Sequence, residues 1–347
     1  MIKIYDLKKN SFFLLKDSFS RKYLKSKGIV PVNNPLQADV LISPSSYFKS
    51  YKVAKLMLPH KKYMIWCNEP RFDYTTEGFV NDKRIIMNVY SGDVFLHNLH
   101  FLGSYHSNFA NNLGIDMYTM PGYPLTVERL ARKQKFCVAI FSYQKPKSSK
   151  LMFDDQNIDL RMVRQRLALY MYQREKMDIV GGNWPVNVDV YESSGFDSGN
   201  MDWWTTKMDL LKNYRFNLCY ENTIFPNYCT EKLWHAIASG CLPIYYGKGT
   251  SIYKTFPQDS FIDGSKFESN KALFDFLENI TPEEHVARYN TCLEVMHQSL
   301  AKRVQDPTLK TEVQDRFIHN IYQLVNRPTA VVPALTNGIL SPPITLS

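Results

Sequence analysis

The sequence of 347 residues lacks several features that define other protein classes. Its 6 cysteines are widely spaced without a C-x-x-C pair, and at least three fall in apolar runs that suit a small buried side chain. No stretch approaches the length of a membrane-spanning helix, and the first residues carry charge where a signal peptide needs an apolar core. We therefore expect a reducing, cytoplasmic location, with peripheral membrane contact left open.

A nucleic-acid-binding motif is also missing, although the formal net charge is +9. The basic residues are scattered or form short pairs such as Lys8-Lys9 and Lys61-Lys62. An excess of positive charge favours an anionic partner, either a phosphate-bearing substrate or an anionic membrane face. Because the clustered basic residues of a nucleic-acid interface are absent from the sequence, we expect no nucleic-acid partner.

The first part of the chain alternates short apolar runs with polar helical stretches. The runs at 38–43 and 63–67, for example, are separated by a basic helical segment. This rhythm is typical of βαβ units around a parallel sheet, and it predicts an α/β fold. Between Met120 and Lys135, a stretch with Pro and Gly followed by the charged segment 128–133 predicts an interdomain linker.

The second part of the chain begins with a new strand pattern. Apolar runs at 136–141, 177–180 and 216–220 predict strands, and helices are predicted between them. Residues 328–347 show no periodicity and predict a mobile tail. We therefore predict a first domain at 1–125, a second at 135–300, and a carboxyl-terminal helix with a flexible tail at 301–347.

A strand, a polar loop and a helix follow one another between Phe216 and Ala238. Thr230 can cap this helix with its hydroxyl, and Gly240 can end it. Ligands bind beyond the carboxyl ends of parallel strands, and a helix amino terminus stabilises a diphosphate through its N–H groups. The charge of Lys232 would add to this, while Glu231 could accept hydrogen bonds from ribose hydroxyls. Thr-Glu-Lys also describes an ordinary helix start, so these three residues alone do not establish a site.

The longer motif around these residues resembles the signature of the α1,3/α1,4-fucosyltransferases. It reads Tyr220-Glu221-Asn222-Thr223, a short loop, and then Tyr228-Cys229-Thr230-Glu231-Lys232-Leu233. The family pattern is Phe-Glu-Asn-Ser/Thr, a short loop and Tyr-x-Thr-Glu-Lys-Leu, so the departure is Tyr220. The resemblance is dense over 207–247, weaker over 135–182 and thin before that.

This resemblance implies an inverting glycosyltransferase of the GT-B fold, with two Rossmann-like domains facing across a cleft. The first domain would bind an oligosaccharide acceptor, by family default of the N-acetyllactosamine type, and the second would bind GDP-fucose. Transfer would form an α1,3 or α1,4 linkage. Such enzymes hold the diphosphate without a resident metal, although Mg²⁺ or Mn²⁺ sometimes stimulates them.

The resemblance also implies roles for individual residues. Asn222, Tyr228, Glu231 and Lys232 occupy the donor-binding positions of the family motif. A second cation for the diphosphate is expected on the helix after the first strand of the second domain. Arg166 fits best, because Leu169 and Tyr170 match the apolar-aromatic pair that follows the family's arginine. Arg161 and Arg164 are rivals on the same helix.

The catalytic base of the family is a Glu that follows an aromatic-rich strand and lies close to a Pro. Glu69 answers this description within Trp66-Cys67-Asn68-Glu69-Pro70, although the family separates the Glu and Pro by one residue. Asp73 and Glu77 remain alternatives. His97, His100 and His106 lack the spacing of a compact metal site, so we predict no structural metal.

Two other functions fit the same residues. One is a GT-B transferase that uses another nucleotide sugar, because a diphosphate cradle does not select the sugar. The other is a non-catalytic glycan- or nucleotide-binding protein that has kept the fold and lost turnover.

Overall fold

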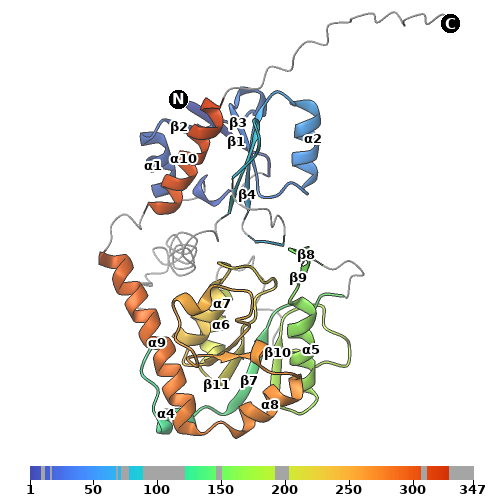
Figure 1. Ribbon diagram of the computed structural model, residues 1–347, viewed down its shortest axis with the longest axis vertical. Coiled ribbons are helices and arrows are strands. Elements are labelled where there is room, and N and C mark those ends of the chain that lie inside the picture. The colour runs from blue at the N-terminus through green and yellow to red at the C-terminus, as the bar shows by residue number, and fades with distance from the viewer. Residues whose placement is uncertain are drawn as a thin grey trace, which may run out of the picture.

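The computed structural model describes residues 1–8, 12–15, 18–67, 69–71, 78–88, 122–145, 151–191, 203–305 and 311–327 (Figure 1). Within these ranges the chain forms two α/β units, one above the other in the view of Figure 1. Each unit is built on its own, mainly parallel sheet.

The amino-terminal domain contains a six-stranded sheet of order β2-β1-β3-β4-β6-β5. Every pairing is parallel except that of β5 with β6. The strands are β1 (Ile2–Asp6), β2 (Ile29–Pro31), β3 (Val40–Ser43), β4 (Lys62–Cys67), β5 (Gly78–Asn81) and β6 (Arg84–Asn88).

Helices cover both faces of this sheet, because successive strand side chains point to opposite sides. Val40 and Ile42 pack in the cluster shared with α1 (Ser18–Ser26) and α10 (Glu312–Asn326). Leu41, between them, packs in the cluster shared with α2 (Lys49–Met57). Figure 1 accordingly shows α1 and α10 on one side of the sheet and α2 on the other.

The carboxyl-terminal domain contains a five-stranded, fully parallel sheet of order β10-β7-β11-β12-β13. Its strands are β7 (Lys135–Ile140), β10 (Met177–Val180), β11 (Tyr214–Leu218), β12 (Leu242–Tyr245) and β13 (Ile262–Asp263). Its helices are α4 (Val127–Ala131), α5 (Arg161–Tyr172), α6 (Trp203–Leu211), α7 (Glu231–Ala238), α8 (Asn270–Asn279) and α9 (Pro282–Gln305). A small hairpin, β8 (Met152–Phe153) with β9 (Gln156–Asn157), precedes α5.

Two Rossmann-like domains in this arrangement make the GT-B fold, so the predicted fold class is confirmed. The predicted strands are present within a few residues of their expected bounds, and β10 has the predicted bounds. Gly181 follows β10 directly, with φ of 121°. A Cβ there would lie 2.7 Å from the Phe141 backbone, so no other residue fits without a shift.

The domain boundaries differ from those predicted at both ends of the second domain. The Leu125 N–H donates to Oδ1 of Asn290 on α9 and its carbonyl accepts from Nδ2 of the same residue, and α4 packs on α9. The described part of the predicted linker, from residue 122, is therefore part of the carboxyl-terminal domain. Conversely, α10 returns to the amino-terminal domain and completes its core. The predicted tail at 328–347 lies outside the described residues.

All six cysteines are buried and none is in a disulfide, whereas the sequence predicted burial for at least three of them. Among the helices of the described ranges, none is both long and apolar enough to cross a bilayer.

The return of α10 predicts that the amino-terminal domain depends on a segment near the end of the chain. Phe317 is fully buried against Phe12 and Trp66, with ring centroids 4.8 and 6.1 Å away. We expect Phe317→Ala to cost about 3–5 kcal/mol of stability in urea unfolding, because the cavity cannot be refilled. His319→Ala, at an exposed site on the same helix, should cost less than about 0.5 kcal/mol. Equal losses in both variants would contradict the packing of α10 on this sheet.

Candidate functional site

The candidate site lies where the connections of the carboxyl-terminal sheet diverge. From β7 the chain runs through α5 to the neighbouring β10, whereas from β11 it runs the other way through α7 to β12. In open parallel sheets the loops on either side of such a switch point leave a binding site at the carboxyl ends of the strands. Here Leu160 N–H donates to the Asn222 carbonyl at 3.1 Å, which joins the loop before α5 to the loop after β11.

A buried carboxylate organises the loop between β11 and α7. Glu221 is 2% exposed, and its Oε1 accepts hydrogen bonds from the backbone N–H and the hydroxyl of Thr230, at 2.6 and 2.9 Å. Its Oε2 lies 3.1 Å from the Lys232 ammonium. Burial raises the pKa of Glu221, and Lys232 opposes this shift. Thr230 therefore directs its hydroxyl to Glu221 and not to the first turn of α7, so the predicted side-chain cap is wrong.

Lys232 and Glu231 stand at the start of α7 and form the next layer of charge. The Lys232 ammonium also contacts the Thr230 hydroxyl at 2.6 Å and the Glu231 carboxylate at 3.5 Å. Burial lowers the pKa of Lys232, but Glu221 and Glu231 outweigh burial and raise it. Burial raises the pKa of Glu231, but Lys232 and Lys207 outweigh it and lower the pKa to about 2. Both groups are charged at neutral pH.

Lys207 of α6 is a second cation close to Glu231 and Lys232. Its side chain is buried, and burial lowers its pKa to about 8, while Glu231 opposes the shift. It was predicted only as a helix residue, because a single lysine in a helical segment carries no functional signal of its own.

Arg164 of α5 supplies a third cation. It is 6% exposed, its Nη1 donates to the Tyr220 carbonyl at 3.3 Å, and its guanidinium lies 4.3 Å from the Phe141 ring centroid. Its Nε is buried and has no hydrogen-bond partner in the structure. Burial lowers its pKa to about 10, against the attraction of Glu221, so it stays charged at neutral pH.

Arg166, the predicted donor cation, is not brought into this cluster. Residues two apart on a helix point to nearly opposite sides, and Arg166 is exposed where Arg164 is buried. Arg164, its rival on the same helix, is therefore the arginine that lies in the cluster. Arg161, the other rival, pairs with Asp159 at 2.7 Å.

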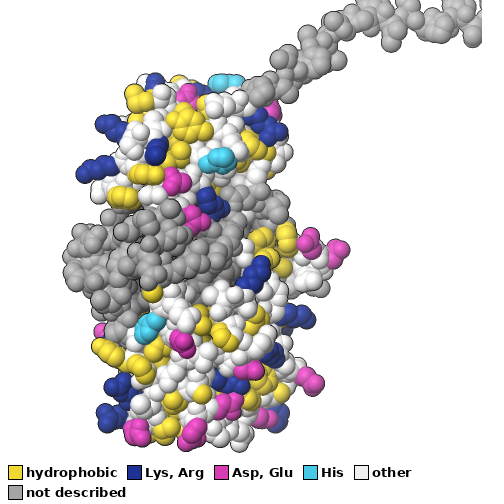
Figure 2. Space-filling model, turned by 60° about the vertical axis from the view of Figure 1, so that its left-hand side comes forward, with side chains coloured by type: hydrophobic (Ala, Val, Ile, Leu, Met, Phe, Trp, Pro, Cys, Tyr) yellow, Lys and Arg dark blue, Asp and Glu magenta, His cyan; other side chains and the backbone are white. Residues whose placement is uncertain are grey.

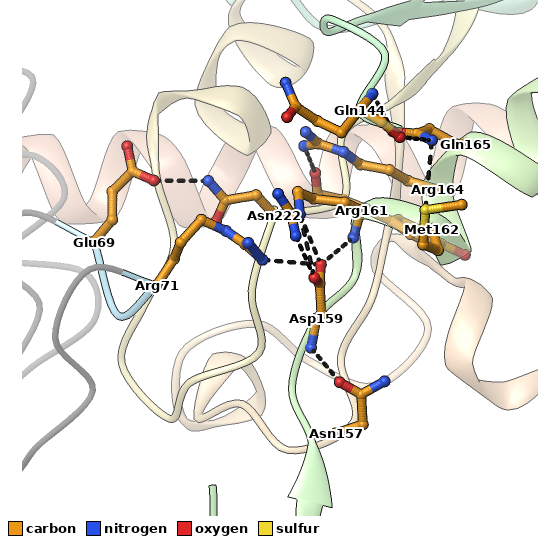
Figure 3. A network of polar contacts seen from close by, with 11 residues as sticks. Glu69, Arg71, Gln144, Asn157, Asp159, Arg161, Met162, Arg164, Gln165 and Asn222 are labelled. Carbon is orange, nitrogen blue, oxygen red and sulfur yellow. Dashed lines mark hydrogen bonds and ion pairs between the residues drawn. The ribbon is translucent and has the colours of Figure 1, made fainter. Parts of the chain in front are cut away.

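Glu69 reaches the site from the amino-terminal domain. It follows β4, and its Oε2 accepts a hydrogen bond of 2.7 Å from Asn222 Nδ2 of the β11–α7 loop (Figure 3). The structure thus joins the predicted base to a predicted donor-binding residue across the two domains. The alternatives Asp73 and Glu77 lie outside the described residues, as do His97, His100 and His106.

A second bridge between the domains lies beside the first. Arg71 Nη2 contacts Asp159 Oδ1 at 2.9 Å, and Arg161 contacts the other oxygen of the same carboxylate (Figure 3). These three side chains are 11–15% exposed. An antiparallel bridge between Asp159 and Thr223 places Asp159 next to Asn222, so the 69–71 loop is held at two adjacent points.

Tyr228 lies between the two domains. Its side chain is buried and belongs to the hydrophobic cluster of the amino-terminal domain, although it comes from the β11–α7 loop. Burial raises its pKa well above the usual range, and Glu69 and Glu221 add to the shift. Asn222, Tyr228, Glu231 and Lys232 are therefore gathered in one region, as the motif predicted.

The arrangement suits an anionic ligand at the start of α7. Lys232, Lys207 and Arg164 surround this end of the helix, where its dipole also favours negative charge. The ionised Glu231 can only accept hydrogen bonds, which suits hydroxyl groups of a ligand. Glu221, Arg71 and Asp159 were not predicted as site residues. The pairing of Arg71 with Asp159 joins residues distant in the sequence, whereas Glu221 belongs to the motif and its partners Thr230 and Lys232 are close by.

Comparison with known proteins places the motif in a defined family region. Residues 172–311 match glycosyltransferase family 10 (fucosyltransferase), C-terminal part. Similar curated proteins include 4-galactosyl-N-acetylglucosaminide 3-alpha-L-fucosyltransferase FUT6 of Pongo pygmaeus and 3-galactosyl-N-acetylglucosaminide 4-alpha-L-fucosyltransferase FUT3 of Homo sapiens. Each is 38% identical over 86 residues, which is 24% of this chain and 23% of the relative. The match thus spans less than a quarter of these relatives.

Two kinds of solved structure are similar at lower identity. An α1,3-fucosyltransferase with GDP-fucose is 16% identical, with a TM-score of 0.48, over 94% of this chain and 91% of that one. The T4 phage BGT with UDP-glucose is 11% identical, with a TM-score of 0.46, over 92% of this chain and 99% of that one. The fold described above follows from the order of the strands and does not depend on these similarities.

The Arg71–Asp159 bridge predicts a large stability effect, because removing one partner of a buried ion pair leaves an uncompensated charge. We expect Asp159→Ala to cost about 3–5 kcal/mol in urea unfolding. Asp209→Ala, which breaks the exposed pair with Lys212, should cost less than about 1 kcal/mol. Arg71→Met should also destabilise the protein. The double variant Arg71→Met/Asp159→Ala should lose less stability than the two single variants together. Strict additivity of the two single variants would show that the bridge is not formed in solution.

Proposed function

We propose that this chain, whose residues 172–311 match glycosyltransferase family 10, transfers L-fucose from GDP-β-L-fucose to a glycan. The acceptor is a hydroxyl of a GlcNAc-containing, N-acetyllactosamine-type glycan, and the new linkage is α1,3 or α1,4. One observation carries this proposal. Lys232 of the motif stands at the start of α7 with the cations Lys207 and Arg164 nearby, and the Glu69 carboxylate of the other domain contacts the β11–α7 loop.

The donor is bound by the carboxyl-terminal domain in this proposal. The diphosphate lies at the start of α7, where Lys232, Arg164 and Lys207 offset its charge, and Glu231 accepts hydrogen bonds from the ribose hydroxyls. As the glycosidic bond breaks, negative charge grows on the β-phosphate, and fixed cations stabilise it without reorganisation. A resident metal is not part of the proposal, and added Mg²⁺ or Mn²⁺ would at most stimulate.

Glu69 is the proposed base. A bond forms between the acceptor oxygen and the anomeric carbon while the bond to the β-phosphate oxygen breaks on the opposite face, so the configuration inverts. The acceptor proton passes to the Glu69 carboxylate, and GDP leaves with the bonding electrons. Because Oε2 of Glu69 accepts from Asn222, the carboxylate has a defined orientation and Oε1 is directed elsewhere.

The tests below distinguish the proposed function from two alternatives. Another nucleotide sugar would use the same diphosphate cradle, since these cations contact no sugar. A non-catalytic binding protein would keep donor affinity and show no turnover. The family match disfavours the first alternative, and the bond between Glu69 and the donor-side Asn222 disfavours the second.

Transfer assays test the proposal together with its base. We expect product from GDP-fucose and N-acetyllactosamine, with the linkage determined by NMR, and none from GDP-mannose or UDP sugars. Glu69→Gln should lower kcat by about 10²–10⁴-fold, because an amide cannot take the proton, while GDP affinity stays within about twofold. The matched control is Glu128→Gln, which changes an exposed carboxylate of α4 and should leave kcat unchanged. Unchanged turnover in Glu69→Gln would remove this residue from the mechanism.

GDP binding separates the two candidate arginines. We expect Arg164→Ala and Lys232→Ala to weaken GDP binding by about 10- to 100-fold in calorimetry, because each loses a charge-assisted hydrogen bond. Arg166 lies two positions further along α5 and is exposed, so Arg166→Ala should bind GDP within about twofold of the parent. Circular dichroism would confirm that each variant is folded. The assignment fails if Arg166→Ala weakens binding and Arg164→Ala does not.

A further inference from the structure

One exposed surface of the amino-terminal domain combines positive charge with bare apolar side chains. It is formed by α2 and the residues just before it, and we call it the α2 surface. Its members are Tyr47, Lys49, Lys52, Val53, Lys55, Leu56 and Met57. Leu56 is 79% exposed and Met57 70%, while Tyr51 and Ala54 on the inner face attach the helix to the sheet.

The charge of this surface has one sign. No Asp or Glu occurs anywhere from Val40 to Asn68, whereas lysines stand at 49, 52, 55, 61 and 62. Lys8, from the loop after β1, extends the positive charge, because its ammonium lies 4.4 Å from the ring centroid of Phe48. The cations of α2 are therefore not neutralised by carboxylates of their own segment.

A hollow of about 430 Å³ opens at the edge of the α2 surface. It is lined by Ser46, Tyr51, Lys52, Lys55, Leu56 and Arg84. Arg84 is fixed there, since its Nη1 donates to the Tyr51 hydroxyl at 3.2 Å. Three cations and two hydroxyl-bearing residues without a carboxylate form a lining that suits a phosphate, and the exposed Leu56 lies at its rim.

The opposite face of the same domain differs. It also carries basic residues on α1, but α10 brings acidic residues among them, as where the Tyr23 hydroxyl donates to Asp315 at 2.8 Å. Figure 2, which shows this side of the molecule, has basic side chains interspersed with acidic and hydrophobic ones. Single-sign charge beside exposed apolar groups is thus a feature of the α2 surface.

We propose that the α2 surface docks on an anionic lipid bilayer, with Leu56 and Met57 entering the interface and a lipid phosphate in the hollow at Arg84. Helices that lie on membranes combine these two kinds of contact, apolar burial and attraction of basic side chains to anionic lipids. The α2 surface includes none of the residues of the candidate active site, and the docking does not depend on the proposed transfer reaction.

Vesicle co-sedimentation of the full chain tests this proposal. Phosphatidylcholine vesicles that contain phosphatidylglycerol should bind the protein at low ionic strength and release it at high ionic strength, whereas pure phosphatidylcholine should not bind it. Lys52→Gln/Lys55→Gln should bind roughly 10- to 30-fold more weakly, because each basic side chain near an anionic surface contributes about fivefold. Leu56→Ser/Met57→Ser should also bind more weakly, and both changes are at exposed sites that leave the fold intact.

The matched control is Lys22→Gln/Lys25→Gln, which removes the same charge from exposed positions of α1 on the opposite face. It should bind vesicles as the parent does, within about twofold. Equal weakening in the control would show attraction by net charge alone and overturn the proposal. An absence of vesicle binding would also overturn it. A third contrary result would be that the protein binds an RNA oligonucleotide and no vesicles, and that Lys52→Gln/Lys55→Gln abolishes the RNA binding.

Discussion

The buried carboxylate of Glu221 is the interaction on which the site depends. A carboxylate almost removed from water is costly unless its oxygens are satisfied, and both are occupied by Thr230 and Lys232. These contacts fix the loop from β11 to α7 in one conformation. They also fix the direction of Lys232, whose long side chain would otherwise have many rotamers. The motif therefore holds the ammonium of Lys232 at the start of α7, and Glu221 is as necessary for this as Lys232 itself.

The second constraint is that the proposed reaction needs groups from both domains at one point. The carboxyl-terminal domain provides the cations, and the amino-terminal domain provides Glu69, shortly after β4. Two adjacent bridges hold this loop, one to Asn222 and one from Arg71 to Asp159. Because contacts hold both Glu69 and Arg71, the proposed base loses little freedom when a substrate binds, which is the advantage of a preorganised site. The return of α10 ties the end of the chain to the domain that carries the base.

Much of this was predictable from the sequence because it is encoded locally. Apolar runs of strand length predicted strands of both sheets, and the motif from Tyr220 to Leu233 predicted residues that the structure brings together in one region. The choice of Arg166 over Arg164 shows where local patterns stop. The choice depended on Leu169 and Tyr170 as the apolar-aromatic pair, and this local match does not reveal that α5 buries Arg164 and Gln165. Gln165 can be buried because it exchanges hydrogen bonds with the Gln144 backbone, a partner that no helical periodicity reveals.

The placement of α10, the Arg71–Asp159 bridge and the domain boundary also depend on contacts between residues far apart in the sequence, which local patterns do not reveal.

The most direct test of the account is a crystal structure of the full chain with GDP. The account predicts the β-phosphate at the start of α7, within hydrogen-bonding distance of the Lys232 ammonium and the Arg164 guanidinium, with the ribose against Glu231. A nucleotide bound elsewhere, with these three side chains making no contact to it, would contradict the central claim.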